Sequence, residues 1–231
     1  MKNMLSTKIA AGTSGPSKTF APGNITAKIN SVALEENRFK PGSYYLVLNL
    51  EGEDLGPEFE GFMINKDNPE MGRHKGQVGK VKTSEWAYSD GETKTGMQIS
   101  RDIEILRAVK NICTSMGIMD WYDAQDEKHE TIEDLVTTFN SDAPFKDRWM
   151  EYCVAGREYL NKQGYTNYDL YLPKFNKGFA PYATLDNEDK LIKFDPALHV
   201  RKAEVKSVES FGDDMDTEAP KAKTINKDFE L

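Results

Sequence analysis

The sequence contains few of the residues from which metal sites, disulfide frameworks and most catalytic centres are built. It has two cysteines and three histidines in 231 residues, with no C-x-x-C and no H-x-x-x-H pair. Cys113 and Cys153 lie forty residues apart, which fits two reduced, buried thiols better than a disulfide framework or a zinc site. We therefore expect no metal, no cofactor and a reducing compartment, which places the protein in the cytoplasm.

Long hydrophobic runs are also missing. No apolar stretch approaches the ~18 residues that a membrane-spanning helix needs. The N-terminal stretch MKNMLSTKIAAGTSGPSKTF has no continuous apolar segment of the kind found in a secretory signal. We expect a protein that neither spans a membrane nor is exported.

The motifs of common enzymes are absent or incomplete. Gly79-Lys80 lacks the upstream glycine of a P-loop, and Val81 follows where Ser or Thr is needed. Glu204-Val205-Lys206 matches the E-x-K of some metal-dependent nucleases, but no upstream carboxylate is selected, and a solvated alternating strand explains it more simply. The sequence favours a protein that is not an enzyme and leaves a nuclease as a distant alternative.

Charge is spread unevenly along the chain. The segment 209–231 holds seven acids and three lysines, a net −4 and half of the total of −8. Residues 1–34 contain four lysines and no acid, and residues 170–185 contain two lysines and no acid. An acidic total therefore does not exclude a nucleic acid partner, because basic segments remain once the acidic one is set apart.

Extended patterns predict strands over 24–36, 43–53 and 58–65, joined as an antiparallel meander. Residues 66–98 contain five glycines at irregular spacing and are expected to have no regular structure. After residue 144 the extended pattern returns as a hairpin over 147–160 and 165–175. A further extended or helical piece is expected within 191–211.

Helical spacing appears between these two groups of strands. Ser100 and Gly117 bound a helix over 101–116, in which apolar residues recur at Ile103, Leu106, Val109, Cys113 and Met116. A second helix is expected from Thr131, where T-x-x-D fits a loose capping box, through Phe139.

Three strands, helices and a hairpin form the element order of an OB-fold. The sequence therefore predicts a mainly β, α+β domain, a five-stranded OB barrel with helices between strands three and four. Other five-stranded barrels and sandwiches fit nearly as well. We expect a flexible arm over 1–22, the domain over 23–208 and a disordered acidic tail over 209–231.

Two segments combine cations with aromatic residues, as sequence-tolerant binding of single strands requires. The first is the glycine-rich segment 71–82 with its flanking aromatic residue, which supplies Arg73, Lys75, Lys80, Lys82 and Trp86. The second is segment 171–182, which supplies Tyr171, Lys174, Phe175, Lys177 and Phe179. The alternatives are a solvated basic loop with Trp86 in the core, and Tyr171 and Phe175 as alternate core residues of an edge strand.

The acidic tail has a separate predicted role. It ends in one aromatic and one leucine with no core to join, so we expect it to bind a partner protein through Asp213, Asp214, Asp216, Asp228, Phe229, Glu230 and Leu231. The tail could also mimic a phosphate backbone in the binding groove. Lys221, Lys223 and Lys227 interrupt its acids, which makes partner docking the better interpretation.

Four stretches of the chain and its tail resemble a known family: FAPGNITAKINSV, FEGFMINKDNPEMGRHKGQVGKVKTSE, ISRDIEILR and NYDLYLPKF, with the tail from ESFGDD to DFEL. The chain resembles phage single-stranded DNA-binding proteins, most of all those of crAss-like bacteriophages, over roughly residues 20–211 and the tail. The resemblance implies an OB-fold, protection of single-stranded DNA, and tail contacts with replication and recombination proteins.

The predicted function is binding of single-stranded DNA without sequence preference during phage replication and recombination. The alternative is a structural or virion-associated interaction module that binds no nucleic acid. Either function is compatible with a homo-oligomer.

Overall fold

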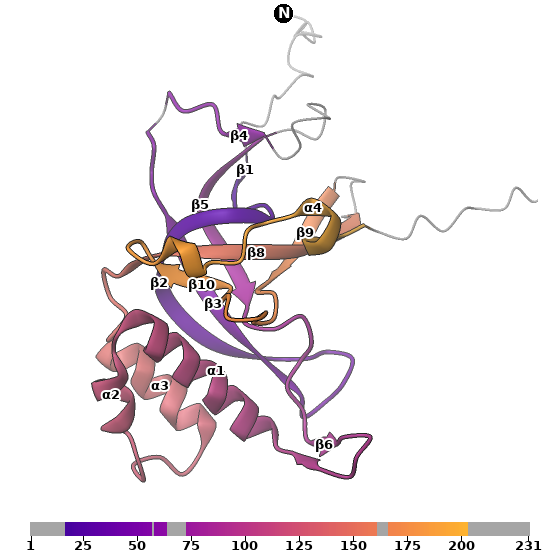
Figure 1. Ribbon diagram of the computed structural model, residues 1–231, viewed down its shortest axis with the longest axis vertical. Coiled ribbons are helices and arrows are strands. Elements are labelled where there is room, and N and C mark those ends of the chain that lie inside the picture. The colour runs from indigo at the N-terminus through magenta and orange to yellow at the C-terminus, as the bar shows by residue number, and fades with distance from the viewer. Residues whose placement is uncertain (1–16, 57, 64–72, 161–165, 203–231) are drawn as a thin grey trace, which may run out of the picture.

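Five strands close into a barrel in the computed structural model, which describes residues 17–56, 58–63, 73–160 and 166–202 (Figure 1). The barrel strands are β2 (Gly23–Glu36), β3 (Tyr44–Gly52), β5 (Arg73–Lys82), β8 (Trp149–Leu160) and β9 (Thr166–Tyr171). Antiparallel pairing joins β5 to β3, β3 to β2, β2 to β8 and β8 to β9. A parallel contact between β9 and β5 closes the circuit, with the helices inserted between β5 and β8. This is the predicted OB-type barrel.

The long strand β2 serves two neighbours. Its first part, Gly23 to Lys28, pairs with β8, and Ala27 to Glu36 pairs with β3. The register with β3 shifts between Ile29 and Ser31, and such a bulge bends a strand so that it can follow a closed barrel.

The third barrel strand lies later in the sequence than predicted. Residues 58–63, the described part of the segment expected as strand three, form only the short β4 (Phe62–Met63). The strand β5 lies in the segment expected to be irregular. The sequence pattern does not indicate β5 as a strand, because the segment is rich in glycine and lysine, which are depleted in strands. One of these glycines is needed here, because a Cβ at Gly79 would clash with the ring of Phe20. Phe20 is buried, and β1 (Ser17–Thr19) pairs with β5, so residues 17–20 belong to the barrel rather than to the predicted arm.

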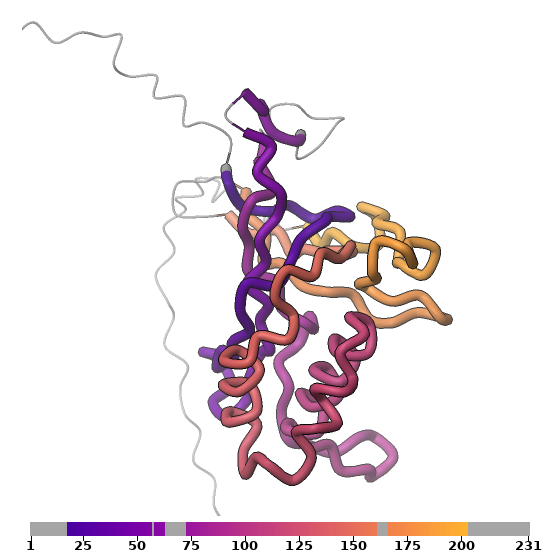
Figure 2. The backbone as a smooth tube through the Cα atoms, turned by 90° about the vertical axis from the view of Figure 1, so that its left-hand side faces the viewer, coloured from indigo at the N-terminus to yellow at the C-terminus, as the bar shows by residue number. Residues whose placement is uncertain are grey.

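Helices α1 (Arg101–Met116), α2 (Met119–Asp123) and α3 (Ile132–Asp142) lie together at one end of the barrel (Figures 1 and 2). The predicted limits of α1 are confirmed, and Gly117 ends it in the left-handed conformation at φ 64°. The predicted start of α3 is also confirmed, since the Thr131 hydroxyl accepts a hydrogen bond from the Asp134 amide at 3.1 Å. Asn140 of α3 bonds both the amide and the carbonyl of Val32 at 2.7 Å, which ties the helices to β2.

The apolar residues that recur at helical spacing in α1 are not all buried. Val109, Cys113 and Met116 are buried, together with Ile105 and Ile112. Ile103 and Leu106 are 52% and 38% exposed. The helix carries two overlapping apolar stripes, and only the one that begins at Ile105 faces the barrel.

The remaining elements cover one side of the barrel or extend from it. They are β6 (Gly91–Glu92), β7 (Gln98–Ile99), β10 (Tyr182–Thr184), the 3-10 helix η3 (Glu188–Lys190), α4 (Pro196–His199) and β11 (Val200–Arg201). Both cysteines are free and buried, as predicted, and burial raises the pKa of the Cys113 thiol to about 12. In the part of the chain that the structure describes, no helix has the length and apolar character to cross a membrane. The predicted tail and the arm up to residue 16 lie outside the described residues.

Candidate nucleic-acid interface

A hollow of ≈ 780 Å³ lies over the outer surface of β3 and β5, beside the loop that joins β2 to β3. We call it the basic hollow. Strand pleating explains its lining: Val81 points into the core and is fully buried, so Lys80 and Lys82 point outward. The face of strands two and three, with the loop between strands one and two, is the surface that OB-folds use for oligonucleotides and oligosaccharides.

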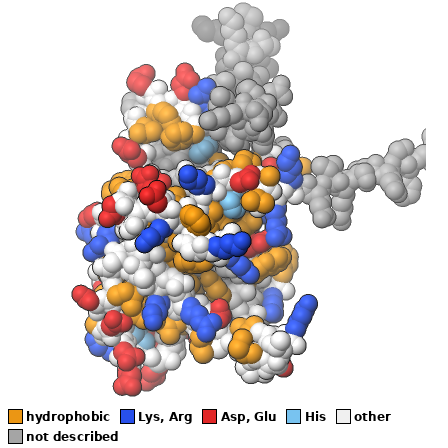
Figure 3. Space-filling model, in the orientation of Figure 1, with side chains coloured by type: hydrophobic (Ala, Val, Ile, Leu, Met, Phe, Trp, Pro, Cys, Tyr) orange, Lys and Arg blue, Asp and Glu red, His pale blue; other side chains and the backbone are white. Residues whose placement is uncertain are grey.

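The basic hollow carries positive charge in an acidic protein. Five cations line it against three carboxylates, a net +2 where the whole chain has −8. The cations are Arg38, Lys40, Lys80, Lys82 and Arg157, and the acids are Glu35, Glu36 and Asp169. Charge is unevenly spread over other parts of the surface as well: on the face shown in Figure 3, Lys and Arg side chains lie among hydrophobic ones over the middle, while many acids gather at the left edge and lower left.

Aromatic rings in the basic hollow are exposed and lie next to cations. Phe39, at the tip of the β2–β3 loop, is 96% exposed, and Trp86 is 55% exposed. The Lys82 Nζ lies 4.2 Å from the ring centroid of Tyr45. The guanidinium of Arg157 lies 5.2 Å from the Trp86 ring, within the range of cation–π attraction. Rings and cations arranged in this way can stack on bases and contact phosphates at the same time.

Glu85 holds two arginines beside Trp86. Its Oε1 lies 2.9 Å from Arg157 and 3.0 Å from Arg201, and its side chain is only 15% exposed. The strand β11 creates this pair, because its parallel pairing with β8 sets Arg201 opposite Arg157. The Arg201 guanidinium lies 6.0 Å from the Trp86 ring. Together these side chains form a preorganised positive edge to the hollow.

Tyr171 supports this edge from below. Tyr171 is only 7% exposed, because Glu85, Arg157 and Arg201 lie beside it, and it is not available for stacking on a base. Burial raises the pKa of Tyr171, the Glu85 charge raises it further, and a hydrogen bond with Arg201 acts in the opposite direction. Its hydroxyl therefore stays protonated at neutral pH and helps to place the arginine.

The lysines of the basic hollow are held by exposed carboxylates. Lys80 lies 2.6 Å from Glu35, and Lys82 lies 2.7 Å from Asp169. These carboxylates are 40% and 45% exposed, and such surface pairs contribute only about 0–1 kcal/mol each. A phosphate can therefore replace either carboxylate at small cost.

The first predicted group of residues is divided along β5. Lys80, Lys82 and Trp86 come together in the basic hollow. Arg73 lies at the other end of the strand, where it donates to the Gly61 carbonyl at 3.1 Å. Lys75 lines a different hollow of ≈ 540 Å³ beside Phe20, Phe62 and His74.

The second predicted group lies on the other side of the segment that contains Trp86. Lys174 and Phe175 line a hollow of ≈ 340 Å³ near α1, together with Thr83 and Tyr88. Phe175 is 53% exposed and packs edge-on against Tyr182 at 5.7 Å. Phe179 is 47% exposed, and Lys177 lies in the tight turn that bonds Asn176 to Phe179. Residues 83–88 thus separate this hollow from the basic one.

Sequence reasoning missed Arg201 at the edge of the basic hollow and several residues within it: Arg38, Phe39, Lys40, Tyr45 and Arg157. The run Arg38-Phe39-Lys40 before the Pro41-Gly42 turn has the cation–aromatic pattern and could have been found. The arginine pair could not, since it depends on the pairing of β11 with β8. Within the residues that the structure describes, no group of three or more His, Cys, Asp or Glu lies together as metal ligands would.

Comparison with known proteins adds no relative: no family model, no curated protein and no solved structure matches the chain. The functional argument therefore depends on the geometry of the molecule itself. That geometry is an OB-type barrel with a hollow of cations and aromatic rings on the face that OB-folds use for binding.

Proposed function

We propose that this protein binds single-stranded DNA without sequence preference, through the basic hollow. The observation that carries the proposal is the position of Trp86, Tyr45 and Phe39 among five cations on the binding face of an OB barrel. OB-folds also bind oligosaccharides, but a net +2 lining favours a polyanion over an uncharged sugar.

The exposed rings favour a single strand over a duplex. A base can stack on Trp86 or Phe39 only if it is not already stacked within a helix, and each such contact contributes roughly 1–3 kcal/mol. Duplex recognition uses a helix or a β-ribbon in the major groove. The lining of the basic hollow comes from strands and loops and presents no such element.

The same lining favours tolerance of sequence. Cations contact phosphates, which are the same at every nucleotide, and a ring accepts the face of any base. We propose protection of single-stranded DNA during phage replication and recombination as the biological role, on the resemblance described above. In this role the segment from Asp213 to Leu231 recruits partner proteins, and the site of action is the cytoplasm.

Fluorescence anisotropy with a labelled oligo-dT and a duplex of equal length tests the proposal. We expect tight, strongly salt-dependent binding of the single strand and weak binding of the duplex. Equal affinity for both, or no binding of either at low salt, would contradict it.

A protein-interaction module without nucleic-acid affinity is the second candidate. One observation favours it: a separate hollow on the helices combines carboxylates with exposed Ile103 and Leu106. A stable, salt-insensitive oligomer that binds no oligonucleotide would support this candidate in place of the first.

A further inference from the structure

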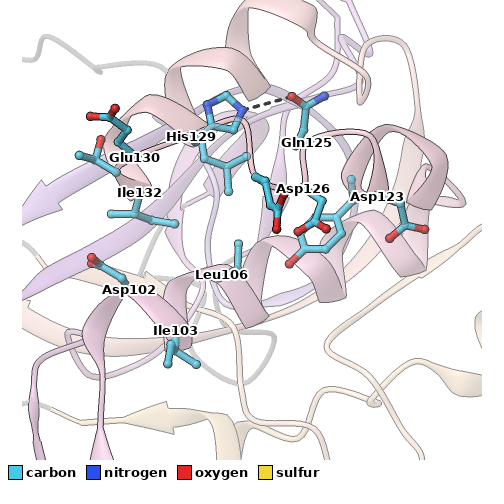
Figure 4. Close-up of a pocket in the computed structure, with 13 residues that line it drawn as sticks. Asp102, Ile103, Leu106, Asp123, Gln125, Asp126, His129, Glu130 and Ile132 are labelled. Atoms are coloured by element: carbon cyan, nitrogen blue, oxygen red, sulfur yellow. Dashed lines mark hydrogen bonds between the residues drawn. The ribbon is translucent and has the colours of Figure 1, made fainter.

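A second large hollow lies among the helices (Figure 4). Figure 1 shows these helices at the other end of the molecule from β1. We call this space of ≈ 660 Å³ the acidic hollow. It is formed by α1, the connection between α2 and α3, and the start of α3. Five carboxylates line it and no lysine or arginine does: Asp102, Asp123, Asp126, Glu127 and Glu130.

Apolar side chains form the floor of the acidic hollow. Figure 4 shows Leu106 pointing into the space between Ile132 and Asp126, with Ile103 at its edge. Ile103 and Leu106 are the two large hydrophobic residues of α1 that the core leaves exposed. A basic ligand without apolar groups would leave this floor uncovered, and an uncharged apolar ligand would leave the carboxylates without partners.

The carboxylates have few partners within the fold. Asp102 pairs with Arg101 at 2.6 Å. Among the described residues, none forms an ion pair with the other four acids: Asp123, Asp126, Glu127 and Glu130. Like charges gathered around exposed apolar groups repel one another, so a basic, apolar occupant would relieve the repulsion and cover the floor.

We propose that the acidic hollow binds the N-terminal segment, residues 1–16, of a second copy of this protein. That segment, MKNMLSTKIAAGTSGP, contains Lys2 and Lys8 and no acid, with apolar residues at Met4, Leu5 and Ile9. Its cations match the carboxylates, and its apolar residues match the floor. No other terminal segment fits, because residues 203–231 are acidic overall.

The position of β1 favours a second copy over the segment's own chain. The described chain begins at Ser17 in β1, and Figure 1 places β1 and the helices at opposite ends of the barrel. A segment that starts from one end of each molecule and binds at the other end of the next gives a head-to-tail contact, which repeats along a row.

Such a row would lie along a single DNA strand and make its binding cooperative. This consequence rests on the proposed function, whereas the contact between copies does not. The two can therefore fail separately.

Charge reversal in the full chain tests the contact in the absence of DNA. One variant, Lys2→Glu with Lys8→Glu, reverses the segment, and the other, Asp126→Lys with Glu130→Lys, reverses the hollow. Sedimentation velocity at low salt should show concentration-dependent association of the unmodified protein. Each variant alone should associate at least about tenfold more weakly. A mixture of the two variants should associate again, because each then offers the other an opposite charge.

A segment bound within its own chain would give no gain of mass in the mixture, and that result would overturn the proposal. So would an unmodified protein that stays monomeric at every concentration. Asp126 and Glu130 are exposed, so folding should survive, and Asp126→Asn with Glu130→Gln serves as a milder variant if the reversal does not fold.

A pair of oligonucleotides separates this contact from DNA binding. On an oligo-dT that holds one protein, both reversal variants should bind like the unmodified protein. On an oligo-dT several sites long, each variant alone should lose cooperativity. Association without any DNA affinity would refute the proposed function and support the contact between copies. Non-cooperative DNA binding by a monomer would refute the contact and support the proposed function.

Discussion

The basic hollow and the acidic hollow differ in both charge and the kind of apolar group that they expose. The basic hollow has five cations, three acids and the aromatic rings of Phe39, Tyr45 and Trp86. The acidic hollow has five acids, no lysine or arginine, and the aliphatic side chains of Ile103 and Leu106. Flat rings beside cations suit bases and phosphates, and aliphatic groups beside carboxylates suit a basic peptide. A net charge of −8 conceals this division.

The fold keeps the two surfaces apart. The basic hollow uses the outward side of strands whose inward side forms the core, so alternate residues of β5 serve each purpose. The acidic hollow uses the side of α1 that faces away from the barrel. Changes in one hollow should therefore leave the other unaffected.

Removing the largest exposed ring should have the largest effect. We expect Trp86→Ala to weaken oligo-dT binding about 10- to 100-fold, since stacking contributes roughly 1–3 kcal/mol per base. On an oligo-dT that holds one protein, Leu106→Ala in the acidic hollow should leave affinity unchanged. Anisotropy titrations of both variants measure the contrast, and an equal loss in the two would remove the distinction between the hollows.

Neutralising the lysines of β5 should change the salt dependence. For Lys80→Gln with Lys82→Gln, we expect affinity to fall and the slope of log K against log salt to decrease by about 0.7–1 for each lysine. Lys128→Gln, a change beside the acidic hollow, is the control. Titrations at four salt concentrations give the slopes, and an unchanged slope would place the phosphate contacts elsewhere.

Removing a competing carboxylate should strengthen binding. Asp169 lies 2.7 Å from Lys82, so Asp169→Asn frees that lysine for a phosphate, and we expect several-fold tighter binding of oligo-dT. Asp126→Asn removes an equal charge from the acidic hollow and should change affinity little for an oligo-dT that holds one protein. Weaker binding by the Asp169 variant would mean that the ion pair positions Lys82 rather than competing for it.

The smallest effect concerns stability in acid, outside both hollows. Burial lowers the pKa of His74 below its usual 6.5, against a hydrogen bond with the Thr19 backbone that raises it. The unfolded chain therefore binds this proton more tightly, and the free energy of unfolding should fall as pH drops through 6.5. Urea unfolding at pH 7 and 5.5 should show a smaller fall for His74→Gln than for His129→Gln; equal falls would exclude His74 as the cause.

Sequence patterns predicted the parts of the fold that depend on local order. The limits of α1, the start of α3 and the hairpin of β8 and β9 follow from caps, periodicity and strand-forming residues. Strand β5 could not be found in this way, because its glycines make room for Phe20, a residue distant in sequence. The choice between Ile103 and Ile105 as the inward residue likewise depends on where the barrel lies against α1.

The candidate site was predicted only where its residues lie close together in the sequence. Lys80, Lys82 and Trp86 lie within seven positions, so their pattern is visible in the sequence. Arg157 and Arg201 meet only through the pairing of β11 with β8. Tyr171 has the residue type of a stacking platform, but it lies beside Glu85, Arg157 and Arg201 and is only 7% exposed.

Photo-crosslinking of the full chain to an oligo-dT that carries 5-iodouracil compares the two hollows most directly. Aromatic residues are available in both, with Phe39, Tyr45 and Trp86 in the basic hollow and Tyr122 in the acidic one. We predict crosslinks, mapped by mass spectrometry, in the peptides that contain residues 37–46 and 83–88. Crosslinks at Tyr122, or bound DNA that crosslinks to neither peptide, would contradict the assignment of the basic hollow as the DNA site.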